Sequence, residues 1–400
     1  MDEKFSWEKI DFHYESEEAR RHAIETNEYI PENNIPFGIE LWREKLILTI
    51  PRRRPGVPST LNYVYLNSSS NNKAPLLNPY PTWSSNKISS VFLISTYRVK
   101  ADICDRLWTI DTGSVVDFDG KGIRIQSPRI KIFNLIENVL LLEYVLKQDD
   151  YVCDSSFTNI VIDVEANSCD EAFAYAVDPA SNTVSVYSMK ENDSWRVKHP
   201  YFLPDPLQTD FVIGKLKFQW DDGLFGFALA DKNKEGFKDV YFHPMSSLFE
   251  FSLNTQILQN KSLTRSKTLS LDFNSIFKIM GSRSATFQAA SSVYDPYSGI
   301  LFFSLINKNG IGCWNSKKFS VYSADTNDIA VADNLTMIYI SDIKLDKNGN
   351  LWAISNKLPI LLYDTYDLQQ INFRIFFSNI RKTIKNTNCE YNRLFWSKRT

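Results

Sequence analysis

The chain has 400 residues, of which 43% are hydrophobic and 14% aromatic, and its formal net charge at pH 7 is −2. So small a charge argues against a nucleic-acid-binding surface, because such surfaces gather Lys and Arg. No apolar run approaches the roughly 20 residues that a membrane-spanning helix needs, so no membrane span is expected. No signal peptide is visible, which is typical of an intracellular protein or of a sequence that begins at a mature end.

Residues 1–36 are highly charged and are expected to form an N-terminal extension that packs on the following domain. Within them, ESEEARRHAIETNEYI (15–30) is a candidate helix that PENNIP (31–36) ends. The segment PRRRPGVP (51–58) predicts a rigid, solvated basic loop, with an anion site as the alternative. The Ser-, Asn- and Pro-rich stretch 66–81 predicts an exposed loop between strands.

A hairpin pattern recurs along the chain. Residues 340–356, ISDIKLDKNGNLWAISN, alternate apolar with polar positions on both sides of a turn that contains Asn-Gly, which predicts two antiparallel strands. Residues 99–112, VKADICDRLWTIDT, match residues 343–356 without a gap. Weaker copies lie around Trp42, Asp163, Asp231 and Asp295.

Successive copies are about 60 residues apart, which is room for four short strands and their loops, the content of one propeller blade. Six copies predict an all-β fold, a six-bladed β-propeller. We expect residues 37–400 to form this single domain, including a C-terminal tail that closes the ring. KLPILLYDTYDLQQINFRIFF (357–377) alternates as outer strands would, and Cys389 in the basic tail could bond to an earlier blade.

Cysteine and histidine spacing gives no metal site. The five cysteines are too widely spaced for a Cys-x-x-Cys knuckle, which leaves two disulfides plus one odd thiol, or five reduced thiols. The four histidines form no zinc motif, and the chain has no P-loop, GxSxG elbow or dinucleotide fingerprint, so neither a metal nor a cofactor is expected. Potential glycosylation sequons occur at Asn67, Asn192, Asn260 and Asn334.

Hairpin geometry places the candidate site at one mouth of the central channel. If residues 346–349 form the turn, Ser341 and Asn356 meet at the other end of the hairpin. Tyr97 takes the equivalent place in the second unit, with Asp111 close by. Phe157, Phe225 and Phe287 precede the inner strands of the third, fourth and fifth units. Such rings and polar groups suit a flat aromatic ligand with a polar tip, although the rings could instead plug the channel.

Several segments resemble the Yellow and major royal jelly protein family of insects, over nearly the whole chain from Trp7 to about Cys389. They are PRRRPGVPSTLNYV (51–64), PLLNPYPTW (75–83), CDRLWTIDTG (104–113), DSWRVKHPYF (193–202), DGLFGFALA (222–230), GCWNSKK (312–318), SDIKLDKNGNLWAISNKLP (341–359) and NFRIF (372–376). The resemblance implies a secreted, often glycosylated six-bladed propeller. It also implies that Cys104 pairs with Cys169 and Cys313 with Cys389, which leaves Cys153 free.

Function divides within the family that the chain resembles. Some members are linked to cuticle melanin, some tautomerise dopachrome or dopaminechrome, salivary members bind biogenic amines, and royal jelly members are nutritive. The resemblance implies a ligand site at the channel mouth that uses Ser341, Asn356, Tyr97, Phe157 and Phe225. Two positions depart from the amine binders, where Ser341 replaces a threonine and Leu358 a phenylalanine.

Three functions therefore remain open. The first is a secreted binder of a small aromatic amine or catechol derivative, in pigmentation or amine scavenging. The second is a dopachrome or dopaminechrome tautomerase of the melanin pathway, for which Asp111 and Asp342 are the candidate general bases. The third is a structural or nutritive protein with a plugged channel, which Phe287 favours. A calcium-dependent lactonase-like hydrolase is disfavoured, because the expected mouth is too aromatic to gather several carboxylates.

Overall fold

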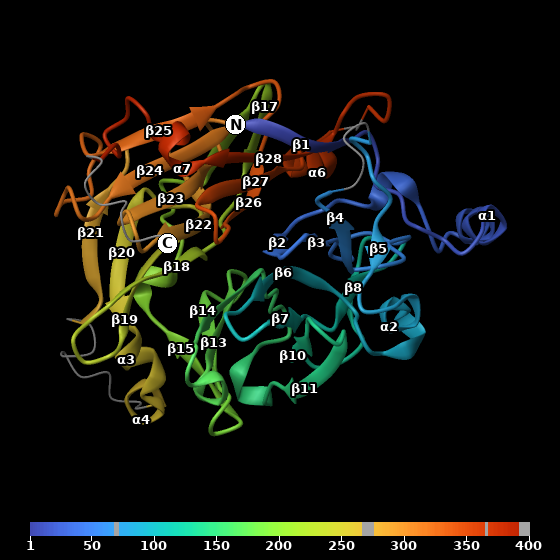
Figure 1. The fold of residues 1–400 in the computed structure, drawn as a ribbon, viewed down its shortest axis with the longest axis horizontal. Coiled ribbons are helices and arrows are strands. Elements are labelled where there is room, and N and C mark those ends of the chain that lie inside the picture. The colour runs from blue at the N-terminus through green and yellow to red at the C-terminus, as the bar shows by residue number, and fades with distance from the viewer. Residues whose placement is uncertain (68–71, 266–275, 365–366, 392–400) are drawn as a thin grey trace.

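A computed structural model describes residues 1–67, 72–265, 276–364 and 367–391 of the chain. In these residues the strands form six four-stranded antiparallel sheets and two separate two-stranded hairpins. The sheets stand around a common centre as the blades of a six-bladed β-propeller (Figure 1). The fold class that the repeated hairpins predict is therefore confirmed.

Each blade is a four-stranded meander with one innermost strand at the centre of the ring. From the centre outwards, blade 1 has β2 (Ile39–Trp42), β3 (Lys45–Thr49), β4 (Leu61–Tyr65) and β5 (Asn78–Pro79); blade 2 has β6 (Thr96–Ala101), β7 (Arg106–Asp111), β10 (Arg129–Asn134) and β11 (Val139–Val145). Blade 3 has β12 (Asn159–Asp163), β13 (Phe173–Asp178), β14 (Thr183–Ser188) and β15 (Asp193–Lys198); blade 4 has β18 (Leu224–Lys232), β19 (Lys238–Pro244), β20 (Phe249–Asn254) and β21 (Lys278–Ser282). Blade 5 has β22 (Ala289–Asp295), β23 (Ile300–Leu305), β24 (Gly310–Asn315) and β25 (Asn327–Ala332); blade 6 has β26 (Ile340–Leu345), β27 (Asn350–Ser355), β28 (Phe373–Asn379) and β1 (Asp2–Trp7).

The remaining elements lie between or beside the blades. The hairpins are β8 (Ser114–Val116) with β9 (Gly122–Arg124) and β16 (Asp210–Ile213) with β17 (Leu216–Gln219). The helices are α1 (Glu17–Glu25), α2 (Trp83–Asn86), α3 (Thr255–Gln259), α4 (Lys261–Arg265), α6 (Leu358–Tyr363) and α7 (Ile380–Thr383). The helix predicted within residues 15–30 is thus present as α1, which the Ser16 hydroxyl caps by accepting a hydrogen bond from the Ala19 N–H (3.1 Å).

An Asp–Trp pair explains why the hairpin pattern repeats. In blade 6 the Asp346 carboxylate accepts hydrogen bonds from the turn N–H groups and one from the Trp352 indole (2.9 Å). In blade 2 the Asp102 carboxylate accepts an equivalent bond from the Trp108 indole (2.7 Å). The carboxylate therefore fixes the turn and orients the ring of the returning strand, so both residues are needed at this spacing.

The inner strands form the wall of the channel. Each of β2, β6, β12, β18, β22 and β26 contacts the innermost strand of both neighbouring blades. The chain enters every blade through its innermost strand. The N-terminal ends of these strands therefore meet at one mouth of the ring. Loops that are far apart in the sequence are thereby brought together.

The ring is closed by the first strand of the chain. β1 pairs with β28 as the outermost strand of blade 6, with Asp2 opposite Phe377 and Trp7 opposite Phe373. From the sequence, all of residues 1–36 are expected to form an extension, because this charged segment carries little strand signal. The structure places its first residues within the propeller.

Three local predictions are wrong. The stretch 66–81 is not an exposed loop throughout, because β5 lies within it and Leu77 and Tyr80 are buried. Residues 358–363 form helix α6 rather than part of an outer strand, because Pro359 has no N–H for a ladder and suits the first turn of a helix. The loop 51–58 is not fully solvated, since Arg52 is buried and its guanidinium donates to main-chain carbonyls. These carbonyls belong to Val57, Pro58, Asn86, Leu93 and Ile94. Burial lowers the pKa of Arg52 to about 10.

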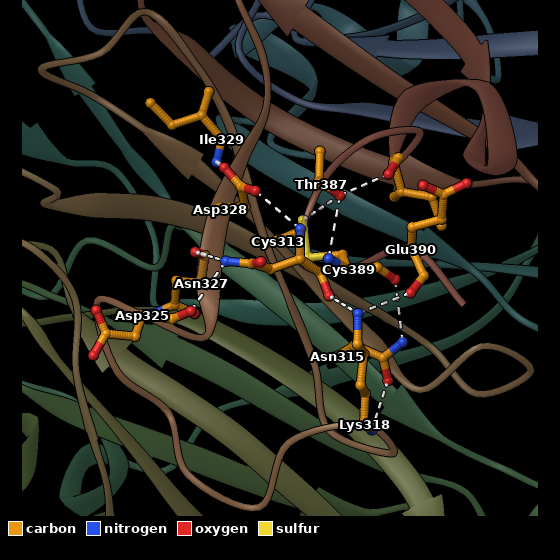
Figure 2. The surroundings of a disulfide bond; sticks show 12 residues. Cys313, Asn315, Lys318, Asp325, Asn327, Asp328, Ile329, Thr387, Cys389 and Glu390 are labelled. Carbon is orange, nitrogen blue, oxygen red and sulfur yellow. Dashed lines mark hydrogen bonds between the residues drawn. A yellow bond between two sulfur atoms is a disulfide. The ribbon is translucent and has the colours of Figure 1, made fainter. Parts of the chain in front are cut away.

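The two disulfides implied by the family resemblance are both formed. Cys104 pairs with Cys169 across blades 2 and 3, Cys313 of β24 pairs with Cys389, and Cys153 is an exposed free thiol. Figure 2 shows how side chains near the second bond hold the tail: the Asn315 amide donates to the Cys389 carbonyl, at 3.2 Å. The C-terminal segment is thus tied to blade 5.

Replacing Cys313 and Cys389 by Ser together is expected to lower the free energy of unfolding by about 2–4 kcal/mol. The bond joins residues 76 apart, so its loss frees a long loop in the unfolded chain. Urea denaturation of the double variant would measure the change. Cys153→Ser is the matched control and should alter stability by less than about 0.5 kcal/mol; an unchanged double variant would contradict the prediction.

Candidate functional site

A cavity of about 350 Å³ opens at the mouth where the inner strands begin, and we call it the channel-mouth cavity. Its walls come from residues before or at the start of inner strands of four blades, from the loops that join the second and third strands of blades 1, 3 and 4, from Trp220 just after β17, and from α6. The lining residues are Phe37, Arg53, Ser156, Thr158, Pro179, Ala180, Trp220, Asp222, Phe225, Met245, Tyr339, Leu358, Leu362 and Tyr363. Its volume falls in the usual range of small-molecule sites, roughly 300–1,000 Å³.

Aromatic rings form much of the wall. Trp220 meets Tyr339 edge to face, with ring centroids 5.7 Å apart, and its indole N–H donates to the Tyr363 hydroxyl at 2.6 Å. Tyr363 of α6 also stacks on Phe218 of β17, with centroids 5.4 Å apart. Tyr339 has a left-handed backbone (φ 52°), which is rare for a bulky residue and common at functional sites. The rim thus presents several flat faces to a ligand.

Charged side chains fill the channel below the cavity. The Arg98 guanidinium lies between the rings of Phe37 and Phe225, at 5.1 and 5.0 Å from their centroids. It forms an ion pair with Asp342 (3.2 Å), and both side chains are completely buried. The Arg98 side chain also donates to the main-chain carbonyls of Ser341 and Thr158. The buried Arg98–Asp342 pair therefore lies behind Phe37 and Phe225, two rings that line the cavity.

One carboxylate of the cavity can titrate near neutral pH. Burial raises the pKa of Asp222 to about 6, against the opposing effect of the Arg53 cation, and its neighbour Asp221 raises it further. The main chain holds Asp222 in place, because the Ser246 N–H donates to its carbonyl at 3.1 Å. A Cβ on the following Gly223 would lie 2.5 Å from the Phe202 carbonyl, so glycine is needed there.

Arg53 and Thr158 complete the polar part of the cavity. Arg53 lies beside Tyr97, Tyr339 and Asp222, whose charges raise the pKa of its guanidinium. The Thr158 hydroxyl is buried and has no hydrogen-bond partner among the described residues. An aromatic enclosure with one cation, one carboxylate and one unpartnered hydroxyl can hold a flat molecule and exchange a proton with it.

The aromatic and apolar residues proposed from the sequence divide between the cavity and its surroundings. Phe225 and Leu358 line the cavity, and Tyr97 packs edge-on against Phe37, with centroids 5.2 Å apart. Phe157 is buried in the hydrophobic core that blades 2 and 3 share. The ring of Phe287 lies under the Lys308 ammonium, 5.0 Å away, and does not line the cavity.

Ser341 and Asn356 meet at the mouth, yet their side chains bind main-chain groups and do not line the cavity. The Ser341 hydroxyl donates to the Phe37 carbonyl (2.7 Å), and the Asn356 amide donates to the Pro36 carbonyl (2.9 Å). The Asn356 side-chain oxygen accepts a bond from the Leu358 N–H (3.1 Å). Both residues thus position the segment that carries Phe37.

Asp111 and Asp342 lie outside the cavity and are engaged in structural bonds. Asp111 is buried, and it accepts hydrogen bonds from the N–H groups of Ile94 (2.8 Å) and Ser95 (2.9 Å). Asp342 accepts bonds from the Ile39 N–H (3.0 Å) and the Ser291 hydroxyl (2.9 Å), besides its ion pair. The carboxylate that does line the cavity, Asp222, was missed, although it lies only two residues before the inner strand β18.

The remaining sequence-level proposals concern modification, membranes and metals. All four sequon asparagines are exposed. In the parts of the chain that the structure describes, no helix is long and apolar enough to cross a membrane. Within the same residues, no group of three or more His, Cys, Asp or Glu side chains could hold a metal ion.

Comparison with known proteins gives consistent matches. The family model of the major royal jelly proteins matches residues 94–389. L-dopachrome tautomerase yellow-f of Drosophila melanogaster is 32% identical over 98% of this chain and 94% of its own length. Protein yellow of Drosophila guanche is 34% identical over 98% of this chain and 67% of its own length. With its family match and these relatives, the chain belongs to the Yellow and major royal jelly protein family.

Proposed function

We propose that the chain is a tautomerase of an aminochrome, an indoline quinone derived from a catecholamine, and that the reaction takes place in the channel-mouth cavity. The observation that carries the proposal is the placement of Asp222, with its pKa near 6, in an aromatic enclosure beside Arg53. A general base works best when its pKa lies near the working pH. The similarity to a dopachrome tautomerase over almost its whole length supports the same reaction class.

The proposed reaction is an isomerisation that needs no oxidant or cofactor. The aminochrome stacks flat on the Trp220 ring, and the Tyr339 ring, which meets Trp220 edge to face, lies against the edge of the bound molecule. Asp222 removes a proton from a carbon of the five-membered ring, the electron pair of that C–H bond moves into the quinone, and a quinone oxygen takes up a proton. This first transfer gives a quinone methide. Loss of a second proton, from the neighbouring carbon of the same ring, and protonation of the second quinone oxygen give the dihydroxyindole, and Asp222 passes each proton that it accepts to water. Arg53 pairs with the carboxylate that L-dopachrome carries.

A second candidate is a binder of aromatic amines without turnover. A carboxylate among several rings also suits an ammonium group, which is attracted both to Asp222 and to the ring faces. In this reading Arg53 opposes cation binding, which favours the tautomerase.

One purified sample separates the two candidates. The absorbance decay of freshly made L-dopachrome and dopaminechrome measures turnover, and calorimetric titration with dopamine, serotonin and octopamine measures amine binding. Accelerated decay of either aminochrome supports the tautomerase. Amine binding without accelerated decay supports the binder. The absence of both signals would refute both candidates.

Arg53→Gln is expected to lower kcat/KM for L-dopachrome by about 10–100-fold, because the variant loses a charge-assisted hydrogen bond to the carboxylate of this substrate. Dopaminechrome has no carboxylate, and its kcat/KM should change less than about 3-fold. Because Arg53 lowers the pKa of Asp222, its loss raises that pKa, so both rates are compared on the alkaline plateau of each variant's own pH profile. An equal loss of kcat/KM for the two substrates would show that Arg53 does not bind the carboxylate of L-dopachrome.

We also propose that the chain works outside the cell as a glycoprotein in pigmentation. Two disulfides are typical of proteins that fold in an oxidising compartment, and the sequon asparagines are accessible. Loss of mass on treatment of the secreted protein with an N-glycosidase would test this.

A further inference from the structure

A second cavity, of about 690 Å³, lies on the side of the ring. It is enclosed by α1, the loop 51–58, the α2 region and the β8–β9 hairpin, and we call it the N-terminal cavity. It has no lining residue in common with the channel-mouth cavity. Figure 1 shows α1 standing away from the blades, on the side of β5 and α2.

The wall on the propeller side is apolar. It includes buried Val57 and the side chains of Trp83 and Val116, together with Ile88 and Phe118, which are 43% and 71% exposed. Folded proteins rarely leave such side chains around an unfilled space, because close packing stabilises the interior. A cavity of this size and lining is therefore suited to a ligand.

The opposite wall comes from α1 and keeps the space open. Ala19 and Ala23, one helical turn apart, line the cavity with small side chains that cannot fill it. The helix is held in place from elsewhere: Arg20 forms an ion pair with Asp11 (2.7 Å), and the Tyr29 hydroxyl donates to the Ile10 carbonyl (2.7 Å). The space between α1 and the propeller is therefore bounded by segments that other contacts hold in position.

The polar groups of the N-terminal cavity indicate an uncharged ligand. Its rim carries three acidic and three basic side chains, which are Glu15, Glu28, Asp117, His22, Arg54 and Lys87. Buried Arg52 adds no free cation, since its guanidinium is bound to main-chain carbonyls. The Tyr14 ring packs against Trp83 at a tilt of 34°, with centroids 4.7 Å apart, and its buried hydroxyl has no hydrogen-bond partner among the described residues.

We propose that the N-terminal cavity is a second binding site, for a neutral and mainly apolar molecule that carries one hydrogen-bond acceptor, such as a carbonyl oxygen. The apolar wall takes the body of the molecule, and the Tyr14 hydroxyl donates to the acceptor. The site is independent of the reaction proposed above, because it uses other residues.

The test uses prodan, a neutral naphthalene ketone whose emission shifts to the blue in apolar surroundings. The full chain should bind it saturably at one site per molecule. Ala19→Trp, at an exposed helix position, should fill the cavity and weaken prodan binding at least 10-fold. Tyr14→Phe should weaken it by about 3–10-fold through loss of one hydrogen bond.

Glu25→Trp is the matched control, because it adds the same ring to α1 away from the cavity and should leave binding unchanged. Phe118→Asp replaces an exposed side chain of the apolar wall and provides a second variant if Ala19→Trp does not fold. Absence of saturable binding to the wild-type chain, or unchanged affinity in folded Ala19→Trp or Phe118→Asp, would overturn the proposal.

Discussion

Asp222→Asn is expected to lower the kcat of aminochrome tautomerisation by about 10²–10⁴-fold, the usual contribution of a general base. The amide has nearly the same shape as the carboxylate, so the cavity should still bind the substrate while losing its proton acceptor. Stopped-flow absorbance at saturating substrate would measure kcat. A variant that kept its kcat would exclude Asp222 as the base.

The pH profile of the same reaction gives an independent test. Because the base must be ionised and the pKa of Asp222 is raised to about 6, kcat/KM should be low at pH 5, rise through pH 6 and level off above pH 7. Asp221→Asn is the matched control: it removes a neighbouring negative charge that raises the pKa of Asp222. This variant should keep the plateau rate and shift the acidic limb to lower pH.

Asp342→Ala is expected to lower the free energy of unfolding by about 3–5 kcal/mol, because it leaves Arg98 charged and buried without its partner. The change also removes the acceptor for the Ile39 N–H and the Ser291 hydroxyl. The urea midpoint of unfolding, compared with that of the wild type, would measure the loss.

Two further variants make the Asp342 result interpretable. Glu171→Ala breaks an exposed ion pair with Lys190, and it should leave the urea midpoint of unfolding almost unchanged because solvent screens the pair. The double variant Arg98→Met/Asp342→Leu removes the Arg98 and Asp342 charges together and should be more stable than Asp342→Ala alone, although in both variants Lys344 loses its own 3.2 Å ion pair with Asp342. A small effect of Asp342→Ala would show that Arg98 is not held mainly by this ion pair.

The blades were predictable because their signal is local. Asp102 with Trp108, and Asp346 with Trp352, bond within a single hairpin, so the spacing appears directly in the sequence. The pairing of β1 with β28 has no such signal, since the two strands are distant in the chain.

The location of the candidate site was partly predictable, but its chemistry was not. Hairpin geometry pointed to the mouth where the cavity lies and to Phe225, which lines it, because both depend on where an inner strand begins. The proximity of Arg53 to Asp222 depends on how the loop after β3 and the loop before β18 face each other across the ring. For Ser341 and Asn356, the sequence could not show that Pro36 and Phe37 would occupy their polar groups.

The pairing of β1 with β28 sets an order for folding during synthesis. Glu3 and Arg374, whose side chains form a 3.0 Å ion pair in this sheet, are 371 residues apart. A ribosome therefore releases the first strand long before its partner exists, and blade 6 is the last blade that can be completed. Until then β1 remains an unpaired strand, which Asp2, Glu3 and Lys4 help to keep from pairing with other chains.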